Sequence, residues 1–147
     1  ANMLDSLNEQ ILVKKKPYLG ICIGLQILAD KSYEETETNG FGWIPGEVVK
    51  IDKINGVRIP HMGWNNVQIK KKSGLFKDFK DNPTFYFVHS YYLDTFDNKY
   101  VTSTCIHGNL ITASIRKENI FAVQFHPEKS QDNGLRLLNN FFEEVDY

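Results

Sequence analysis

The 147-residue sequence has few cysteines, almost no net charge and no long apolar run. Two cysteines, Cys22 and Cys105, cannot form the dense disulfide framework on which small secreted domains depend. A formal net charge of -1 gives no electrostatic reason to expect nucleic acid or an anionic membrane as a partner. Neither a secretory leader pattern nor an apolar run long enough to span a bilayer is found. These absences predict a cytoplasmic protein without nucleic-acid or membrane partners.

What is there fits a single globular domain. A hydrophobic content of 41% and a charged content of 24% are typical of a folded chain with one core. A chain of 147 residues is long enough to bury that core without disulfides or structural metals. We therefore predict one domain over residues 1–147, with small molecules or proteins as its ligands.

The first third of the chain is predicted to form a helix, a strand, a sharp turn and a second helix. Apolar residues at i, i+3 and i+7 predict an amphipathic helix over Asn2–Val13. Tyr18–Ile21 reads as a short buried strand, and Gly24–Ser32 reads as a second amphipathic helix. The polar, glycine-punctuated stretch Glu34–Gly42 is predicted to be a loop.

The remainder is rich in strands and ends in a helix. Asn55-Gly56 favours a tight hairpin turn between two β-like runs, and an apolar stripe predicts a closing helix over Asp132–Glu144. The β-like runs are Glu47–Ile51, Gly56–Ile59, Val67–Lys70, Phe85–Val88, Tyr100–Ile106, Leu110–Arg116 and Ile120–Gln124. This order predicts an α/β fold: a mostly parallel sheet flanked by helices, with an antiparallel insertion.

Cys22 lies in Gly20-Ile-Cys-Ile-Gly24, where the predicted strand turns into the predicted helix. This G-x-C-x-G pattern is the thiol form of a nucleophile elbow, in which flanking glycines avoid clashes in a tight turn. A helix N-terminus beside the sulfur would lower the thiol pKa, and the backbone N–H of Ile23 would face a developing oxyanion. On this motif alone, a nucleophile and a small buried residue are equally compatible with Cys22.

His126 is the best candidate for a base that activates such a thiol. Phe125-His-Pro-Glu128 follows an apolar strand, and the proline is expected to keep the chain extended. Side chains in extended chain alternate, so His126 and Glu128 would project to one side as an imidazole and its orienting carboxylate. A surface His-Pro-Glu turn is the simpler alternative. Both candidates follow strands, at the edge where open α/β sheets bind ligands.

The remaining cysteine and histidines suggest no metal or cofactor. Two cysteines far apart in sequence, without paired histidine spacing, form no credible metal-ligand set. Cys105 lies inside a β-like run and is predicted to be buried in the core. His61 and His89 could be structural hydrogen-bonding residues or ligand contacts, and His107 is predicted to lie in an ordinary turn.

Four stretches together resemble a known family. Pro17–Gln26 (PYLGICIGLQ) and Phe125–Glu128 (FHPE) resemble the signatures of class I, or triad, glutamine amidotransferases. Ile59–Asn65 (IPHMGWN) and Tyr86–Tyr91 (YFVHSY) are similar to the glutaminase subunits of imidazole glycerol phosphate synthases, which serve histidine biosynthesis. The resemblance runs in order from Pro17 to Phe142, which covers nearly the whole chain.

The resemblance implies a fold and a reaction. It implies the flavodoxin-like fold of class I amidotransferases and a catalytic triad of Cys22, His126 and Glu128. This triad would hydrolyse the side-chain amide of glutamine through a thioester, without cofactor or metal. The ammonia would pass to a barrel-shaped cyclase subunit in a heterodimer.

The resemblance also assigns binding roles. Gln26 and Glu34 match positions that hold the α-carboxylate and α-amino ends of glutamine, and the Ser90-Tyr91 backbone matches another glutamine contact. The full predicted substrate-binding set is Gly24, Gln26, Glu34, His89, Ser90 and Tyr91. Trp64, Asn65 and Lys129 match positions near the interface with the synthase subunit.

The chain departs from the family pattern at its beginning. Family members carry opening strands and a glycine-rich turn that supplies part of the oxyanion hole, and Ala1–Lys16 resembles neither. We therefore expect the domain to be incomplete at its N-terminus, without the first strands of the sheet. Loss of one oxyanion donor commonly lowers turnover by about 10²–10³, so we expect the chain alone to be a weak or inactive glutaminase.

Three other functions remain open on the sequence. A paralogue that supplies ammonia for amidination of a surface-polysaccharide sugar shares all four motifs. A truncated, non-catalytic interaction module would leave Cys22 unlabelled by a glutamine-analogue electrophile. A stand-alone cysteine hydrolase would turn over without any partner.

Overall fold

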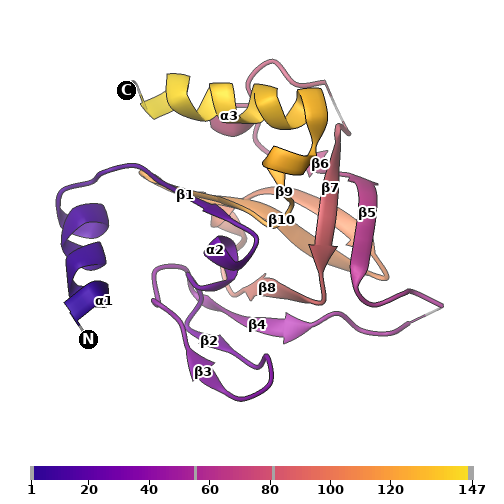
Figure 1. Ribbon diagram of the computed structural model, residues 1–147, viewed down its shortest axis with the longest axis horizontal. Helices are drawn as coiled ribbons and strands as arrows, with labels where there is room; N and C mark the ends of the chain where they lie inside the picture. Colours follow the sequence, from indigo (N-terminus) through magenta and orange to yellow (C-terminus); the bar gives the residue numbers. More distant parts are fainter. Residues whose placement is uncertain (1, 55, 81, 146–147) are drawn as a thin grey trace.

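A computed structural model of the protein describes residues 2–54, 56–80 and 82–145. Three sheets form the centre of the molecule, and the C-terminal helix α3 lies across one side of them (Figure 1). The helices and helical turns are α1 (Asn2–Leu7), η1 (Asn8–Val13), α2 (Ile23–Gln26), η2 (Gly74–Phe76), η3 (Asn98–Tyr100), η4 (Pro127–Lys129) and α3 (Gln131–Val145). The strands are β1 (Tyr18–Ile21), β2 (Lys31–Ser32), β3 (Thr38–Asn39), β4 (Gly46–Lys50), β5 (His61–Asn66), β6 (Gln68–Ile69), β7 (Thr84–His89), β8 (Tyr91–Thr95), β9 (Val101–His107), β10 (Asn109–Lys117) and β11 (Ile120–Val123).

The five-stranded sheet, in the order β1-β11-β10-β9-β6, carries the core. Strand β1 pairs in parallel with β11, from Tyr18 opposite Ile120 to Ile21 opposite Val123. The other neighbours in this sheet pair antiparallel, so among the described residues its parallel character is confined to β1 and β11. The mostly parallel pairing predicted from the sequence is therefore wrong for this sheet, although the mixed α/β class holds. All four residues of β11 are buried, as expected for a strand covered on both faces.

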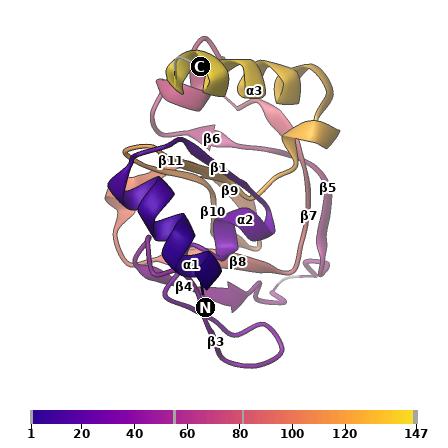
Figure 2. The same ribbon diagram turned by 60° about the vertical axis from the view of Figure 1, so that its left-hand side comes forward.

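The two faces of β11 contribute to different hydrophobic clusters. Phe121 belongs to the cluster that contains Phe141 of α3, whereas Ile120 belongs to the cluster that contains Ile11 of η1 and Leu25 of α2. Burying a large apolar side chain stabilises a fold by about 1.5–3 kcal/mol. The helical elements thus fix the sheet from both sides and hold the ends of β1 and β11 in place (Figure 2).

Two smaller sheets complete the fold. The order β3-β2-β4-β8 makes a four-stranded sheet, and β5 pairs antiparallel with β7 as a two-stranded ribbon. Figure 1 shows β5 and β7 side by side at the edge of the molecule opposite α1. These antiparallel strands agree with the predicted insertion.

Several predicted elements are found with small shifts. Strand β1 has the predicted bounds, α3 lies within one residue of the predicted closing helix, and Asn2–Val13 is helical throughout. The last six residues of that first segment, η1, are wound as a π-helix, which sequence spacing does not reveal. The predicted loop over Glu34–Gly42 contains the two-residue strand β3.

The predicted helix over Gly24–Ser32 is wrong in length. Helix α2 ends at Gln26, because a later loop takes the backbone carbonyls that would continue it. Phe41 N donates to Ile27 O at 2.7 Å, and Gly42 N donates to Ala29 O at 3.0 Å. The turn after Cys22 is therefore secured by chain that lies more than a dozen residues further on.

The middle of the chain departs most from prediction. Residues 56–59 form no strand, and the predicted hairpin turn at Asn55-Gly56 lies partly outside the described residues, because Asn55 is not described. Strand β4 pairs instead with β8 and β2. Strands β5 and β8 were not predicted, since β5 is rich in polar residues and glycine rather than in β-branched side chains.

None of the helices that the structure describes has the length and apolar character needed to cross a membrane.

Candidate active site

Cys22 occupies a strained turn between β1 and α2. Its backbone lies at φ 55° and ψ -102°, a region that residues with side chains rarely adopt. A Cβ added to Gly20 would lie 2.3 Å from the carbonyl oxygen of Gly24, so the turn requires glycine at position 20. A Cβ on Gly24 would meet only the hydroxyl of Tyr18, at 3.6 Å. The expected steric need is thus found at Gly20 and not at Gly24.

His126 and Glu128 make the predicted pair. His126 Nδ1 lies 2.8 Å from Glu128 Oε2, with the imidazole 17% exposed and the carboxylate 50% exposed. The predicted reason for this contact is wrong, because Pro127–Lys129 is a 3-10 turn rather than extended chain. The fixed φ of proline suits the first position of a helical turn, and this turn brings the carboxylate back to the ring.

The fold brings Cys22 and His126 to the same edge of the sheet. Strands β1 and β11 run parallel, with Ile21 opposite Val123, so both strands end at that edge. Cys22 N donates to Val123 O at 2.9 Å, which fixes the turn against the end of β11. The carboxylate of Glu128 is near enough to act electrostatically on the Cys22 thiol.

The surroundings of Cys22 raise its thiol pKa, contrary to the expected lowering. Burial is the main cause, and the negative charges of Glu128 and Glu34 add to it. Hydrogen bonds from the Ile23 backbone N–H and from the Gln124 side chain act in the opposite direction. Ile23 N–H therefore lies at the sulfur, its predicted role as oxyanion donor stays a prediction, and the thiol remains protonated in the resting state. Helix α2, whose N-terminus was expected to lower the thiol pKa, is only four residues long.

A cavity of about 440 Å³ opens beside the cysteine turn. The predicted substrate residues Gln26 and Glu34 both line it, together with Ile23. Its remaining lining residues are Ile27, Ser32, Glu35, Thr38, Asn39 and Gly40. Glu34 is exposed at this cavity, whereas the Gln26 side chain is buried and donates its amide to Tyr91 O at 2.9 Å.

The predicted contacts from β7 and β8 lie deeper in the protein. His89 is 6% exposed and places Nδ1 2.8 Å from Tyr91 O. The Ser90 carbonyl accepts a hydrogen bond from Ile51 N at 2.9 Å, so both carbonyls of the Ser90-Tyr91 segment already have protein donors. Of His89, Ser90 and Tyr91, it is Tyr91 that contacts Gln26, through its carbonyl, and none of the three is among the residues that line the cavity.

A chain of buried histidines continues from His89. His61 Nδ1 lies 2.9 Å from His89 Nε2, and Asn65 Nδ2 lies 3.1 Å from His61 Nε2. Burial lowers the pKa of His61 to about 3 and that of His89 to about 4, so both rings are neutral at pH 7. His107, predicted to lie in an ordinary turn, ends β9 and stacks on His61 with ring centroids 4.1 Å apart.

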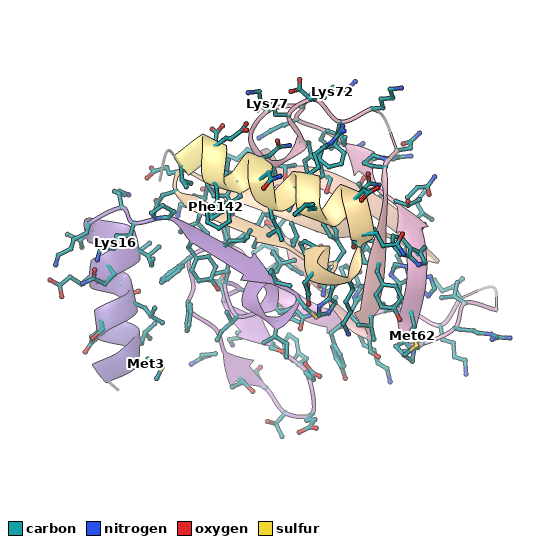
Figure 3. The ribbon with its side chains drawn as sticks, turned by 45° about the horizontal axis from the view of Figure 1, so that its top comes forward. Met3, Lys16, Met62, Lys72, Lys77 and Phe142 are labelled. Atoms are coloured by element: carbon teal, nitrogen blue, oxygen red, sulfur yellow. The ribbon has the colours of Figure 1, made fainter. Side chains whose placement is uncertain are left out.

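The predicted partner residues separate into exposed and inward-facing ones. Trp64 is 49% exposed, and its ring meets Tyr86 of β7 edge to face at 6.0 Å. Met62, also in β5, is 61% exposed and lies at the surface of the molecule (Figure 3). Lys129 is exposed next to the histidine–glutamate pair. Asn65 instead points its amide inward, to His61 and to Ile106 O at 2.9 Å.

Sequence reasoning missed Gln124. This side chain is fully buried and places Nε2 3.6 Å from Cys22 Sγ. The signal was present, because Gln124 is the one polar residue in the apolar run from Ile120 to Phe125. A buried glutamine side chain needs hydrogen-bond partners, so its presence in an apolar strand indicates a polar interaction in the core at this position.

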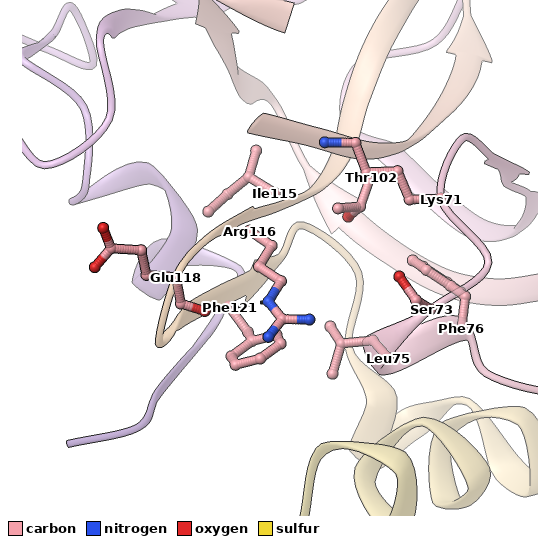
Figure 4. A pocket seen from close by; sticks show the side chains of 9 residues that line it. All are labelled: Lys71, Ser73, Leu75, Phe76, Thr102, Ile115, Arg116, Glu118 and Phe121. Atoms are coloured by element: carbon pink, nitrogen blue, oxygen red, sulfur yellow. Dashed lines mark hydrogen bonds between the residues drawn. The ribbon is translucent and has the colours of Figure 1, made fainter. Parts of the chain in front are cut away.

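A second cavity, of about 150 Å³, lies elsewhere in the fold (Figure 4). The Arg116 guanidinium points into it and lies 4.4 Å from the centroid of the Phe121 ring. Arg116 also pairs with Glu144 of α3 at 2.9 Å, which ties the helix to β10. The cavity contains no paired nucleophile and base among its lining residues, which are Lys71, Ser73, Leu75, Phe76, Thr102, Ile115, Arg116, Glu118 and Phe121.

Within the described part of the chain, no group of three or more His, Cys, Asp or Glu side chains could hold a metal ion. Both cysteines are free. Cys105 is 1% exposed within β9, as predicted for a core residue, and burial raises its thiol pKa to about 12.

Comparison with known proteins identifies a family and sequence relatives of this chain. Residues 3–145 match the family described as "Glutamine amidotransferase class-I". The "Imidazole glycerol phosphate synthase subunit HisH" of Pelagibacter ubique (strain HTCC1062) is 48% identical over 140 residues, which are 95% of this chain and 67% of that protein. The "Imidazole glycerol phosphate synthase subunit HisH 1" of Campylobacter jejuni subsp. jejuni serotype O:23/36 (strain 81-176) is 46% identical over 138 residues, 94% of this chain and 68% of that protein. The chain thus spans about two thirds of the length of these relatives.

Solved structures share the fold. A glutamine amidotransferase from Thermotoga maritima matches with a TM-score of 0.63 at 21% identity, over 96% of this chain and 53% of that one. A second glutamine amidotransferase matches with a TM-score of 0.70 at 18% identity, over 98% of this chain and 68% of that one. These likenesses confirm the predicted α/β fold, and the family match and the sequence relatives establish that the chain belongs to the class I glutamine amidotransferases.

Proposed function

We propose that this chain is the glutaminase part of an imidazole glycerol phosphate synthase, with Cys22 as nucleophile, His126 as general base and Glu128 as its orienting carboxylate. The 2.8 Å contact between His126 and Glu128, at the sheet edge where Cys22 ends β1, is the observation that carries the proposal. Glutamine is the substrate, and the cavity lined by Gln26 and Glu34 receives its amino-acid end.

The proposed chemistry follows from the protonated state of the thiol. Because burial and nearby carboxylates raise the pKa of Cys22, His126 must remove the proton as Sγ attacks the amide carbon of glutamine. The Ile23 N–H stabilises the resulting oxyanion. His126 then passes the proton to the leaving ammonia, and a γ-glutamyl thioester remains on Cys22. Water activated by His126 hydrolyses this thioester to glutamate and restores the thiol.

The proposed partner is a cyclase subunit, which binds the chain as a heterodimer and consumes the ammonia. The exposed face of the β5–β7 ribbon supports this part, because Trp64 and Met62 are both exposed on it. Tyr86 lies next to Trp64 on that face, and its backbone carbonyl accepts a hydrogen bond from His126 N at 2.9 Å. Aromatic residues and methionine are enriched at protein interfaces. Asn65 takes part through its inward hydrogen bonds rather than through direct contact.

A glutaminase assay with and without the cyclase subunit tests the proposal. Glutamate release should depend on Cys22 and rise when the cyclase is added, and Trp64→Ala should weaken that stimulation more than it changes activity without the partner. Phe96→Ala, at a residue 66% exposed elsewhere on the surface, is the matched control. Unchanged turnover in Cys22→Ser would overturn the mechanism, and equal stimulation of Trp64→Ala and wild type would overturn the interface.

The same assay separates the other functions. The sequence relatives carry the synthase name, which favours the histidine-pathway partner over a surface-polysaccharide amidination partner. Stimulation by a polysaccharide-pathway enzyme and none by the cyclase would reverse that preference. An inactive interaction module predicts no covalent labelling of Cys22 by a glutamine-analogue electrophile, whereas the proposed enzyme is labelled.

A further inference from the structure

Gln124 is buried in the protein, and its backbone N–H and both ends of its side-chain amide have hydrogen-bond partners. Its backbone N donates to Ala113 O at 2.8 Å, and its side chain is 0% exposed. Oε1 lies 3.1 Å from Gln26 Nε2, and Nε2 lies 3.6 Å from Cys22 Sγ. A buried amide with fixed partners at both ends cannot rotate without leaving a polar group unpaired, which costs about 1–3 kcal/mol.

The neighbouring groups fix which end of the amide faces the sulfur. The Tyr91 carbonyl can only accept, so the Gln26 atom 2.9 Å from it is the NH₂ group. The second hydrogen of that NH₂ points to Gln124, which must therefore present its oxygen to Gln26. The NH₂ of Gln124 then faces Cys22 Sγ as a donor.

The buried histidines hold the Tyr91 carbonyl in place. His89 Nδ1 donates to this carbonyl at 2.8 Å, which leaves its neutral Nε2 to accept from His61 Nδ1. His61 Nε2 in turn accepts from the amide of Asn65. The donors therefore run in one consistent direction from Asn65 to Tyr91, and the Gln26–Gln124 pair is anchored to a carbonyl that cannot shift independently.

The sulfur needs such a donor because its other neighbours oppose negative charge. The carboxylates of Glu128 on η4 and of Glu34 beside the cavity both act against a thiolate, and burial removes the solvent that would stabilise it. Gln124 and the Ile23 N–H are the groups that act in its favour. A hydrogen bond to a charged group is about twice as strong as one between neutral groups.

We infer that Gln124 is a further catalytic residue, a buried amide donor that stabilises the Cys22 thiolate formed during proton transfer, and that Gln26 is the positioning residue that orients it. This inference rests on the proposed function for its role in turnover. Its effect on the thiol does not depend on glutamine.

The test measures how fast iodoacetamide alkylates Cys22 across a range of pH in the full 147-residue chain. Gln124→Met keeps length and volume but donates no hydrogen bond. It should raise the Cys22 pKa by about one unit and slow alkylation at a fixed lower pH about tenfold, since one pKa unit is a tenfold change in thiolate. Gln68→Met, at an exposed glutamine of β6, should leave both values unchanged. Gln26→Met should give an intermediate shift.

The outcomes are distinguishable. An unchanged alkylation profile in folded Gln124→Met overturns the inference, even if the wild-type chain is an active glutaminase. A raised thiol pKa in a chain that hydrolyses no glutamine, with or without the cyclase, upholds the thiol interaction while the proposed function fails. If Gln124→Met does not fold, Gln26→Met decides: without the Gln26 donor the amide of Gln124 is no longer held with its NH₂ toward the sulfur, so an unchanged thiol pKa there overturns the inference. In an active complex, Gln124→Met should lower kcat with little change in KM.

Discussion

The two cysteines lie in regions of opposite character. Cys22 sits in a positive-φ turn at the end of a parallel strand, partly exposed and next to hydrogen-bond donors. Cys105 sits in the middle of β9, 1% exposed and opposite Ile111 of β10. Burial raises the pKa of both thiols, but only at Cys22 do donors oppose the shift. In the proposed mechanism, the reactivity of Cys22 therefore depends on the groups around the sulfur rather than on a low thiol pKa at rest.

The largest effect that separates the two regions is loss of turnover. Cys22→Ser should lower glutaminase kcat by about 10⁴-fold or more, because removal of the nucleophile disables the catalytic unit. Cys105→Ser should change it less than about threefold. Glutamate release by the chain with its cyclase measures both, and near-equal losses in the two variants would contradict the contrast.

The next largest effect concerns the backbone of the turn. Gly20→Ala places a methyl group 2.3 Å from Gly24 O and should lower the free energy of unfolding by about 1–3 kcal/mol or more. Gly24→Ala is the matched control and should be neutral or stabilising by up to about 1 kcal/mol, since it adds helix propensity. Urea unfolding measures both, and equal destabilisation would show that the turn does not need glycine at position 20.

Stability at acid pH tests whether the two buried histidines, His61 and His89, are neutral in the folded protein. The pKa values of His61 and His89 are lowered from 6.5 to about 3 and about 4, so folding favours their neutral forms. Their contribution to stability is fully present above pH 6.5 and is lost as the pH falls toward 4, because the unfolded chain then binds more protons.

His61→Phe should reduce the slope of unfolding free energy against pH by about one proton in this range. Urea titrations at several pH values measure the slope. Above pH 6.5 the slopes of the two proteins should coincide, and identical slopes below it would contradict the assigned neutral state.

The last predicted effect lies at alkaline pH, outside the range in which the protein is expected to work. An unfolded Cys105 thiol ionises near 9.0 and the folded one near 12, so stability falls as the pH rises between these values, by about 1.4 kcal/mol per pH unit. Cys105→Ala should flatten this decline. Cys22→Ala should flatten it less, because Cys22 keeps donors and partial exposure; the reverse order would contradict the comparison.

Local patterns predicted the strand and the turn that carry the proposed nucleophile and base. The bounds of β1 and the glycine-flanked turn at Cys22 follow from neighbouring residues, and the His126–Glu128 contact was predicted from them but for the wrong reason. The short α2 could not, because the residues that capture its carbonyls lie in the separate loop around Phe41. The 3-10 turn at Pro127 was missed because a proline fits both extended chain and a first helical position.

The role of Gln124 also escaped prediction, for a different reason. Its partners Gln26 and Cys22 are 98 and 102 positions away in sequence, and no local spacing relates them. The histidine chain likewise joins β5 to β7 across 28 positions. A lone glutamine or histidine among apolar residues indicates in the sequence that a polar group is buried in the core. The sequence does not indicate which partners that group contacts.

The hydrogen bond from His126 N to Tyr86 O, 2.9 Å long, couples two parts of the molecule mechanically. Tyr86 belongs to β7 and touches Trp64 on the exposed face of the ribbon. A protein that pushes on this face and shifts β7 along its own direction must either break this bond or move the backbone of His126 with the strand. The β5–β7 ribbon therefore links its exposed face to the backbone of His126 through this hydrogen bond.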